Sequence, residues 1–282
     1  MSTLKTDAAI TWCPGCGNFE ILSSMEAVLM ELSSEGFPME KIVICSGIGN
    51  HGKIVDYLHV NSFYTLHGRA IPAAEAVKLA DQDIKVICFV GDGDTLAEGL
   101  EHLLFAAKRN IDITVVVHDN RTYALATGQF TPTSQLGFKG GTMPYGAKEN
   151  PFNPLELMLV SGATFIARCY PVKKEHFRRV LKEAILHKGF SFIDTLQVCA
   201  TFNNLYSAYN ENVKEVVARE PASFDEALEI IKSWNYYDSE GPIPIGKFFV
   251  TDRPTFEDKF SRFKHDGEDR ALKIDSILDN LL

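Results

Sequence analysis

The sequence predicts an α/β protein built on a doubly wound, mostly parallel sheet. Two apolar runs, IKVICFV at residues 84–90 and IDITVVVHDN at residues 111–120, are rich in β-branched residues and do not alternate with polar ones. Such runs are typical of strands that are buried on both faces. A stretch with helical spacing separates them, so we expect two parallel strands joined by a right-handed crossover. With 282 residues, 45% of them hydrophobic, the chain can form a large core without disulfides.

The predicted elements alternate along the first half of the chain. Helical spacing covers residues 21–32, and KIVIC at residues 41–45 predicts a short buried strand. We then expect, in chain order, an alanine-rich helix at 71–80 with proline in its first turn, a strand at 84–90, a GDGD loop at 91–94, a helix at 95–110 and a strand at 111–120. Residues 121–154 are rich in Gly, Thr, Pro and Ser, and a loop of this length inside a domain is usually functional.

The second half continues the alternation less regularly. We expect a helix at 155–160, a strand at 164–168, a helix at 174–187, a strand from 190 that ends at Cys199, a helix at 222–234, a strand at 246–250 and a charged tail on the surface or against a partner. There is no internal repeat and no clear linker. The interpretation is one domain, residues 1–203, with a C-terminal extension, residues 204–282, that packs on this domain or on a partner subunit.

Composition and charge exclude several classes of protein. The formal net charge is −9 and no basic stretch could follow a phosphate backbone, which argues against nucleic acid as a partner. No apolar run is long enough to span a bilayer, and the first residues lack the features of a signal peptide, so we expect a cytoplasmic protein without a membrane partner. Its six cysteines are then expected to be reduced or bound to metal.

The segment SGIGNHGK at residues 46–53 contains a GxGxxG pattern directly after a predicted strand. A dinucleotide-binding fold would place an acidic residue about 20 positions later, at the end of the next strand. His67 and Arg69 occupy that region instead. A nicotinamide site is therefore disfavoured, which leaves either a glycine turn needed for tight packing or a loop whose backbone approaches another cofactor.

Polar residues follow two predicted strands in a pattern that suggests a cation site. Asp92 comes directly after one strand and Asn120 after the next. If these strands are neighbours, their carboxyl ends lie about 5 Å apart. Mg²⁺ commonly binds one or two protein oxygens together with phosphate oxygens and water. Each feature alone is typical of a turn or a cap, but the two together predict a site for Mg²⁺ and a diphosphate.

The motif combination resembles the β subunits of 2-oxoacid:ferredoxin oxidoreductases. GDGD followed about 26 residues later by DNRTYALATGQFTPTS is similar to the thiamine diphosphate motif of that family, and WCPGCG, SGIG, LHGRAIP, GATFIAR and HKGFSFIDTLQVC occur in the family's order. The likeness covers roughly residues 11–203. It implies a sheet of the thiamine diphosphate-binding type and places SGIG against thiamine rather than a nicotinamide.

The resemblance also assigns roles to residues. Asp92, Asn120 and the carbonyl of Thr122 are expected to bind Mg²⁺. The residues expected to contact the cofactor are Ile48, Gly49, His67, Gly91, Asp92, Gly93, Asp94, Asn120, Thr122, Tyr123 and Leu125. His67 and Lys53 are expected to be catalytic, because both would line the reaction pocket and an ammonium group suits the carboxylate of the substrate.

The cysteines carry a departure from the family. Cys13 and Cys16 form a CxxC, a spacing that can hold a metal or a cluster edge, and the resemblance adds Cys199 as a ligand of a [4Fe–4S] cluster. The family's fourth cysteine follows GIG directly, where this chain has Asn50. Cys45 after a loop rearrangement, His51, Asn50 or a solvent species could complete the site. A labile or absent cluster, or zinc on the same residues, are the alternatives, while Cys88 and Cys169 are expected to be buried apolar residues.

The implied activity is oxidative decarboxylation of a 2-oxoacid to an acyl-CoA, with one-electron transfer to ferredoxin. Thiamine diphosphate supplies the carbanion chemistry and an iron–sulfur cluster accepts single electrons. Because the family's activating glutamate lies in the α subunit, we expect an obligate partner. The alternatives are a non-oxidative decarboxylase component and a non-catalytic paralogue. The identity of the 2-oxoacid does not follow from the sequence.

Overall fold

A computed structural model describes residues 3–216, 223–237, 241–260, 276 and 279–280. Within this part of the chain, eight strands form one sheet in the order β2-β1-β3-β4-β6-β5-β8-β7. The strands are β1 (Ile42–Ser46), β2 (Asn61–Tyr64), β3 (Lys85–Gly91), β4 (Ile113–Asp119), β5 (Phe165–Cys169), β6 (Ser191–Leu196), β7 (Val213–Glu215) and β8 (Ile243–Val250). Only the β5–β8 pair is antiparallel among them, which confirms the predicted doubly wound, mostly parallel sheet.

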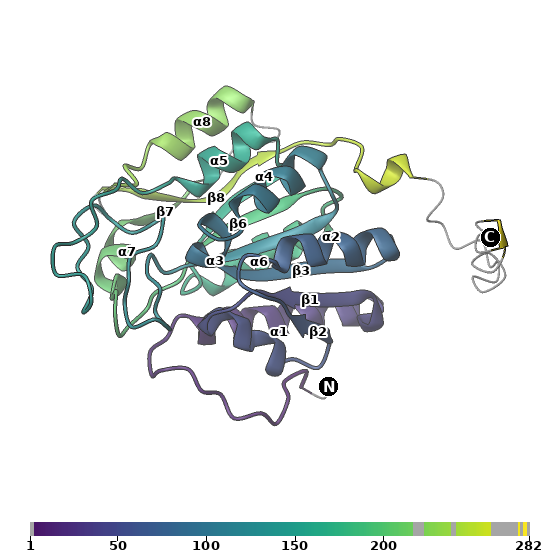
Figure 1. The fold of residues 1–282 in the computed structure, drawn as a ribbon, viewed down its shortest axis with the longest axis horizontal. Helices are drawn as coiled ribbons and strands as arrows, with labels where there is room; N and C mark the ends of the chain where they lie inside the picture. The colour runs from purple at the N-terminus through teal and green to yellow at the C-terminus, as the bar shows by residue number, and fades with distance from the viewer. Residues whose placement is uncertain (1–2, 217–222, 238–240, 261–275, 277–278, 281–282) are drawn as a thin grey trace.

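Helices cover both faces of the sheet (Figure 1). The α-helices are α1 (Asn18–Ser34), α2 (Ala70–Ala80), α3 (Asp92–Leu96), α4 (Leu100–Arg109), α5 (Pro154–Ser161), α6 (Lys174–Leu186), α7 (Tyr206–Asn212) and α8 (Phe224–Lys232). Short 3-10 turns occur at η1 (Met39–Lys41), η2 (Asn50–Asp56) and η3 (Glu257–Lys259). Helices α1 and α6 pack on one face, and α2, α4, α5 and α8 pack on the other. No helix in the described part combines the length and apolar character needed to span a bilayer.

Alternation along the central strands places their side chains in two apolar clusters, one on each face of the sheet, and a third cluster lies under β7 and β8. In β1, Ile42 and Ile44 pack with α1 and α6, whereas Cys45 belongs to the cluster under α2 and α4. Every residue of β1, β4, β5 and β6 is buried, as the unbroken apolar runs predict. The two-sided burial explains why these strands carry no period-2 pattern.

Capping residues end helices α4 and α5 close to their predicted bounds. Asn110 ends α4 in the left-handed conformation, with φ 55°. Helix α5 begins at Pro154 after Asn153, whose side chain accepts the Leu155 N–H, and it ends at Gly162 in the left-handed region. The predicted irregular segment contains no helix or strand between Asn120 and Asn153 among the described residues, which confirms that prediction.

Three predictions of local structure were wrong. GDGD is not a loop, because α3 begins at Asp92, and the helix predicted at 95–110 is broken before Leu100. The break accommodates the neighbouring loop: a Cβ on Gly68 would lie 2.3 Å from the backbone of Glu98, whose carbonyl accepts from the Arg69 guanidinium at 2.8 Å.

The strand predicted from residue 190 to Cys199 also ends earlier than expected, at Leu196. Residues 197–199 leave the sheet, because the Gly17 N–H donates to the Val198 carbonyl. The short edge strand β2 and the elements α7 and β7 were missed. Strand β8 starts three residues before the predicted strand, and α8 lies within the predicted range of 222–234, of which residue 222 is outside the described residues. Most of the charged tail, residues 261–275, 277–278 and 281–282, lies outside them too.

The core of α6 offers a matched test of packing. Leu181 is fully buried, whereas Leu186 on the same helix is 46% exposed. We expect Leu181→Ala to lower the free energy of unfolding by about 2–5 kcal/mol, because the lost side chain leaves a cavity. Leu186→Ala is expected to change it by about 0.5 kcal/mol or less. Urea unfolding followed by circular dichroism measures both, and equal losses in the two variants would contradict this packing.

Candidate active site

The cavity at the carboxyl edge of the sheet brings the predicted cofactor residues together. It has a volume of about 270 Å³. All eleven residues expected to contact the cofactor line it: Ile48, Gly49, His67, Gly91, Asp92, Gly93, Asp94, Asn120, Thr122, Tyr123 and Leu125. Asn50, His51, Ala124 and Ala126 also line it and were not predicted to do so. For Asn50 and His51 the sequence signal is their place in SGIGNHGK, and for Ala124 and Ala126 it is their place next to Leu125.

Asp92 and Asn120 follow neighbouring parallel strands, since Gly91 of β3 pairs with His118 of β4. Asp92 is buried, and its Oδ2 atom accepts the hydroxyls of Thr131 at 2.6 Å and Thr133 at 2.7 Å. Burial raises the pKa of the Asp92 carboxyl, although both hydroxyls oppose the shift. A nearby cation would therefore stabilise this desolvated carboxylate more strongly than it would a carboxylate in water.

Asn120 and Thr122 form a tight turn at the end of β4. The Asn120 Oδ1 atom accepts the Thr122 N–H at 3.0 Å, and the Thr122 carbonyl accepts the Ala124 N–H at 2.9 Å. Each of these oxygens keeps a second lone pair. The turn thus presents an amide oxygen and a carbonyl oxygen at the same edge as Asp92, and this set of hard oxygen donors suits Mg²⁺.

Two glycines allow the loops of the site to approach closely. A Cβ on Gly93 would lie 2.2 Å from the Tyr123 ring, and one on Gly47 would lie 1.8 Å from Asp94 Oδ2. Neither position can therefore hold a side chain without displacing its neighbour. Gly47 is the first glycine of the GxGxxG pattern, so that pattern here allows a loop to pack against an aspartate of α3.

Asp94 and His51 face each other with unused polar atoms. Asp94 Oδ1 accepts the Gly68 N–H at 2.7 Å, while its Oδ2 lies 3.7 Å from His51 Nε2. Both Asp94 Oδ2 and His51 Nε2 are buried without a hydrogen-bond partner among the described residues. Leaving such atoms unpaired is costly, so they are suited to a polar ligand in the cavity.

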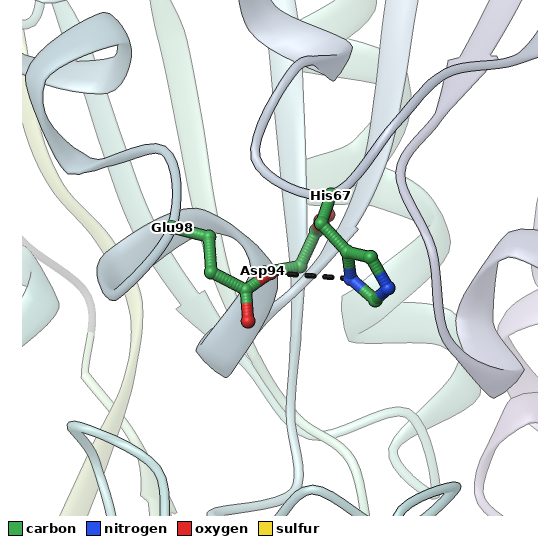
Figure 2. Close-up of side chains that lie close together, drawn as sticks. All are labelled: His67, Asp94 and Glu98. Carbon is green, nitrogen blue, oxygen red and sulfur yellow. Dashed lines mark ion pairs between the residues drawn. The ribbon is translucent and has the colours of Figure 1, made fainter.

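His67 pairs with a glutamate that the sequence did not single out. Its Nδ1 atom lies 3.1 Å from Glu98 Oε2, and Figure 2 shows the two side chains turned toward each other with Asp94 beside them. The Tyr123 hydroxyl donates to the other oxygen of Glu98 at 3.3 Å. Ligand atoms of His67, Asp94 and Glu98 lie within 4.8 Å of one another, the spacing of a possible metal site, but two of these side chains are exposed.

Lys53 is the one predicted catalytic residue that does not line this cavity. Its ammonium pairs with Asp56, which raises the pKa of Lys53, and it lies 5.9 Å from the centre of the Tyr57 ring. To contact a substrate in the cavity, Lys53 has to leave Asp56.

The three cysteines predicted to bind a cluster gather beside the N-terminal end of α1. The Cys16 N–H donates to the Cys13 carbonyl at 3.0 Å, and the segment that ends in Cys199 is held to Gly17 through the Val198 carbonyl. Burial raises the pKa of Cys16 to about 11, and the nearby Cys199 and Cys13 add to this shift. Sequence positions almost 190 residues apart therefore meet at one place.

Two candidates for the fourth ligand of the predicted cluster, Cys45 and His51, lie away from the three cysteines. Cys45 is buried on the opposite face of the sheet from Cys16, and its thiol donates to the Ala70 carbonyl at 3.4 Å. His51 points to Asp94 in the cavity. The structure thus gives no support to Cys45 as a ligand, because side chains of a strand cannot change faces without a shift in register. Asn50 lies close by, since its carbonyl accepts the Trp12 indole N–H at 2.7 Å.

Close packing at Gly93 provides a test of the cavity. We expect Gly93→Ala to lower the free energy of unfolding by about 1–3 kcal/mol, because the added methyl displaces the Tyr123 ring. Gly141→Ala is the control, since a Cβ there meets nothing within 4 Å. Thermal unfolding measures the two variants, and an unchanged stability of Gly93→Ala would show that Tyr123 does not pack as described.

Comparison with known proteins identifies the family. Residues 47–195, just over half of the chain, match the family described as "Thiamine pyrophosphate enzyme, C-terminal TPP binding domain". The 2-oxoacid:ferredoxin oxidoreductase 1 subunit beta of Aeropyrum pernix is 35% identical, over 93% of this chain and 85% of its own. The corresponding subunit of Saccharolobus solfataricus is 38% identical, over 84% of this chain and 81% of its own.

A solved structure agrees with these relatives. It is that of 2-oxoglutarate:ferredoxin oxidoreductase from Magnetococcus marinus with 2-oxoglutarate, coenzyme A and succinyl-CoA bound. The match has a TM-score of 0.87 and 32% identity, and it covers 96% of this chain and 93% of that one. From the fold, the cavity at the strand ends and these relatives, we conclude that the chain belongs to the thiamine diphosphate-dependent 2-oxoacid:ferredoxin oxidoreductases, as a beta subunit.

Proposed function

We propose that this chain binds thiamine diphosphate through Mg²⁺ and, with an alpha subunit, catalyses the coenzyme A-dependent oxidative decarboxylation of a 2-oxoacid, with ferredoxin as the electron acceptor. The observation that carries the proposal is the position of Asp92 and Asn120 at the ends of paired parallel strands in one cavity. In open α/β sheets, ligands bind at this edge.

The residues present fit the cofactor. Asp92, Asn120 and the Thr122 carbonyl offer the oxygen ligands that Mg²⁺ prefers. Gly93 and Asp94 adjoin them for the diphosphate, and Ile48 and Leu125 give the cavity apolar walls for the rings. The cavity is at the small end of the range for cofactor sites, and Leu125 is 64% exposed, which favours a partner subunit that completes it.

Bound thiamine diphosphate supplies the nucleophilic carbon for attack on a 2-keto group and accepts the electrons that remain when CO₂ leaves. The Nδ1 atom of His67 faces Glu98 at 3.1 Å, which leaves its Nε2 atom as the nitrogen that would contact the substrate. Lys53 would bind the substrate carboxylate only after release from Asp56. The resemblance to the family assigns activation of the cofactor to a glutamate of the alpha subunit.

We further propose that Cys13, Cys16 and Cys199 hold a [4Fe–4S] cluster, with Asn50 or solvent at the fourth iron. The three thiols gather at the start of α1, where the nearby Cys199 and Cys13 add to the raised pKa of Cys16, and this set of soft ligands supports a metal centre. Zinc on the same residues is the alternative.

Cofactor binding is tested on the complex with the co-purified partner subunit. We expect thiamine diphosphate to bind only with Mg²⁺, and Asp92→Ala to weaken this binding at least about 100-fold, since a buried carboxylate ligand is lost. Asp83→Ala, at an exposed carboxylate outside the cavity, is the control. Isothermal titration calorimetry measures the affinity of both variants for thiamine diphosphate. Affinity that does not depend on Mg²⁺ would favour a non-catalytic paralogue.

An activity assay distinguishes the oxidoreductase from a non-oxidative decarboxylase component. Anaerobic assays with pyruvate, 2-oxoglutarate and branched or aromatic 2-oxoacids are expected to show ferredoxin reduction that requires coenzyme A. Release of CO₂ without any electron transfer would instead identify a non-oxidative decarboxylase component.

The cluster is tested by metal analysis of anaerobically purified protein. We expect about four iron and four sulfide atoms per chain with absorbance near 400 nm. Cys199→Ser is expected to lose most of this iron, whereas Cys169→Ala, at a buried cysteine of β5, keeps it. Zinc in place of iron would overturn the cluster, and the absence of both metals from this chain would assign electron transfer to a partner subunit.

A further inference from the structure

A buried polar network joins the C-terminal segment to the edge that carries Asp92 and Asn120. Asp119, the last residue of β4, is fully buried. Its Oδ2 atom accepts the Tyr236 hydroxyl in a short hydrogen bond. Its Oδ1 atom accepts the Arg121 N–H at 3.2 Å and lies 2.8 Å from the hydroxyl oxygen of Thr133. One aspartate thus connects three segments distant in sequence.

Thr133 extends this network to the proposed metal ligand. Its Oγ1 atom lies 2.7 Å from Asp92 Oδ2 and 2.8 Å from Asp119 Oδ1. The Thr133 hydroxyl carries one proton, so it donates to one of these two carboxyl groups and accepts a proton held by the other. In either arrangement it joins the carboxyl group after β3 to the one that ends β4. Movement of Asp119 changes the position of Thr133 and, through it, the direction of the Asp92 carboxylate.

Arg121 fixes the other side of Asn120. Its backbone is in the left-handed region, with φ 58°, which is unusual for a residue with a side chain. The buried guanidinium donates from Nε to the Thr133 carbonyl and from Nη2 to the Tyr236 carbonyl, both at 2.6 Å, and lies 4.5 Å from the centre of the Tyr236 ring. Tyr236 therefore contacts the residues on both sides of Asn120 and leaves Asn120 itself untouched.

Packing against Trp234 restricts the position of Tyr236. Its ring packs edge-on against Trp234, with centroids 4.8 Å apart. The Arg168 guanidinium lies 4.7 Å from the Trp234 ring and donates from Nε to Asp194 at 2.8 Å. Aromatic and cation–π contacts of this kind, between buried side chains, restrict the position of the phenol.

We propose that Tyr236 is a positioning residue for the cation site: through Asp119, Thr133 and Arg121 it aligns the oxygens of Asp92 and Asn120 for Mg²⁺. The proposal rests on the proposed function, since it concerns the metal that carries thiamine diphosphate. It gives the C-terminal segment a role in cofactor affinity although none of the residues 204–216, 223–237 or 241–260 lines the cavity.

The test compares Tyr236→Phe with Tyr237→Phe in the complex with the partner subunit. The first change removes only the hydroxyl on Asp119, and the second changes the next residue, whose side chain is 52% exposed. The readout is the Mg²⁺ concentration that gives half-saturation of thiamine diphosphate binding, measured by calorimetry without substrate. We expect Tyr236→Phe to raise this concentration about five- to tenfold with unchanged binding stoichiometry, and Tyr237→Phe to leave it at the wild-type value.

A merely structural role for Tyr236 predicts a different result. It would lower the unfolding temperature and the fraction of competent protein, but the Mg²⁺ requirement of the remaining sites would match the wild type, and that outcome overturns the proposal. If Tyr236→Phe does not fold, Thr133→Val and Thr133→Ser carry the test. We expect the valine variant, which lacks the bridging hydroxyl, to show the raised Mg²⁺ requirement and the serine variant, which keeps it, to resemble the wild type.

Failure of the proposed function is distinguishable from failure of this inference. If wild-type protein binds no thiamine diphosphate with Mg²⁺, the proposed function falls, and the inference falls with it. If the wild type binds and Tyr236→Phe has the same Mg²⁺ dependence, only the inference falls.

Discussion

The register between β3 and β4 is the constraint on which the site depends. The two strands run parallel and pair from Val86 with Ile113 to Gly91 with His118, so they end at the same edge of the sheet. Polar residues that follow each strand are then brought together by backbone hydrogen bonds alone. A shift of one residue would point the side chains of one strand to the other face. The apolar side chains that pack on both faces of these strands oppose such a shift, and the core thereby secures the geometry of the site.

Burial of charged groups at this edge requires compensation, and the surrounding loop provides it. Asp92 contacts the hydroxyls of Thr131 and Thr133 from the irregular segment, and Asp119 accepts the Tyr236 hydroxyl and the Arg121 N–H and shares the Thr133 hydroxyl with Asp92. Burial, with the nearby Asp194 and Asp92, raises the pKa of Asp119 well above its usual range. The segment from Arg121 to Asn153 forms turns through its own backbone hydrogen bonds, and its threonine hydroxyls also satisfy the carboxyl groups at the strand ends. A long irregular loop is therefore part of the site rather than a connection.

The same carboxyl edge also organises the cysteines. The chain leaves β6 after Leu196 and turns toward Gly17, which brings Cys199 to the CxxC turn. Helix α7 adds a further contact, because the Tyr206 hydroxyl donates to the Gly15 carbonyl at 2.9 Å. The cysteines of the proposed electron carrier and the cofactor cavity thus lie at the same edge of the sheet. Asn50 belongs to both, since it lines the cavity and accepts the indole N–H of the residue before Cys13.

The sequence by itself determined the class of fold and most of the residues that line the cavity. Unbroken apolar runs predict buried parallel strands, and polar residues directly after them predict the ligand edge, because both signals are local. Only the tertiary structure decided which side chains meet. The pairing of His67 with Glu98, the bond from Tyr236 to Asp119 and the burial of Cys45 on the opposite face depend on contacts between segments far apart in sequence. The break between α3 and α4 has the same cause, since the loop at Gly68 overrides the helical spacing of residues 95–110.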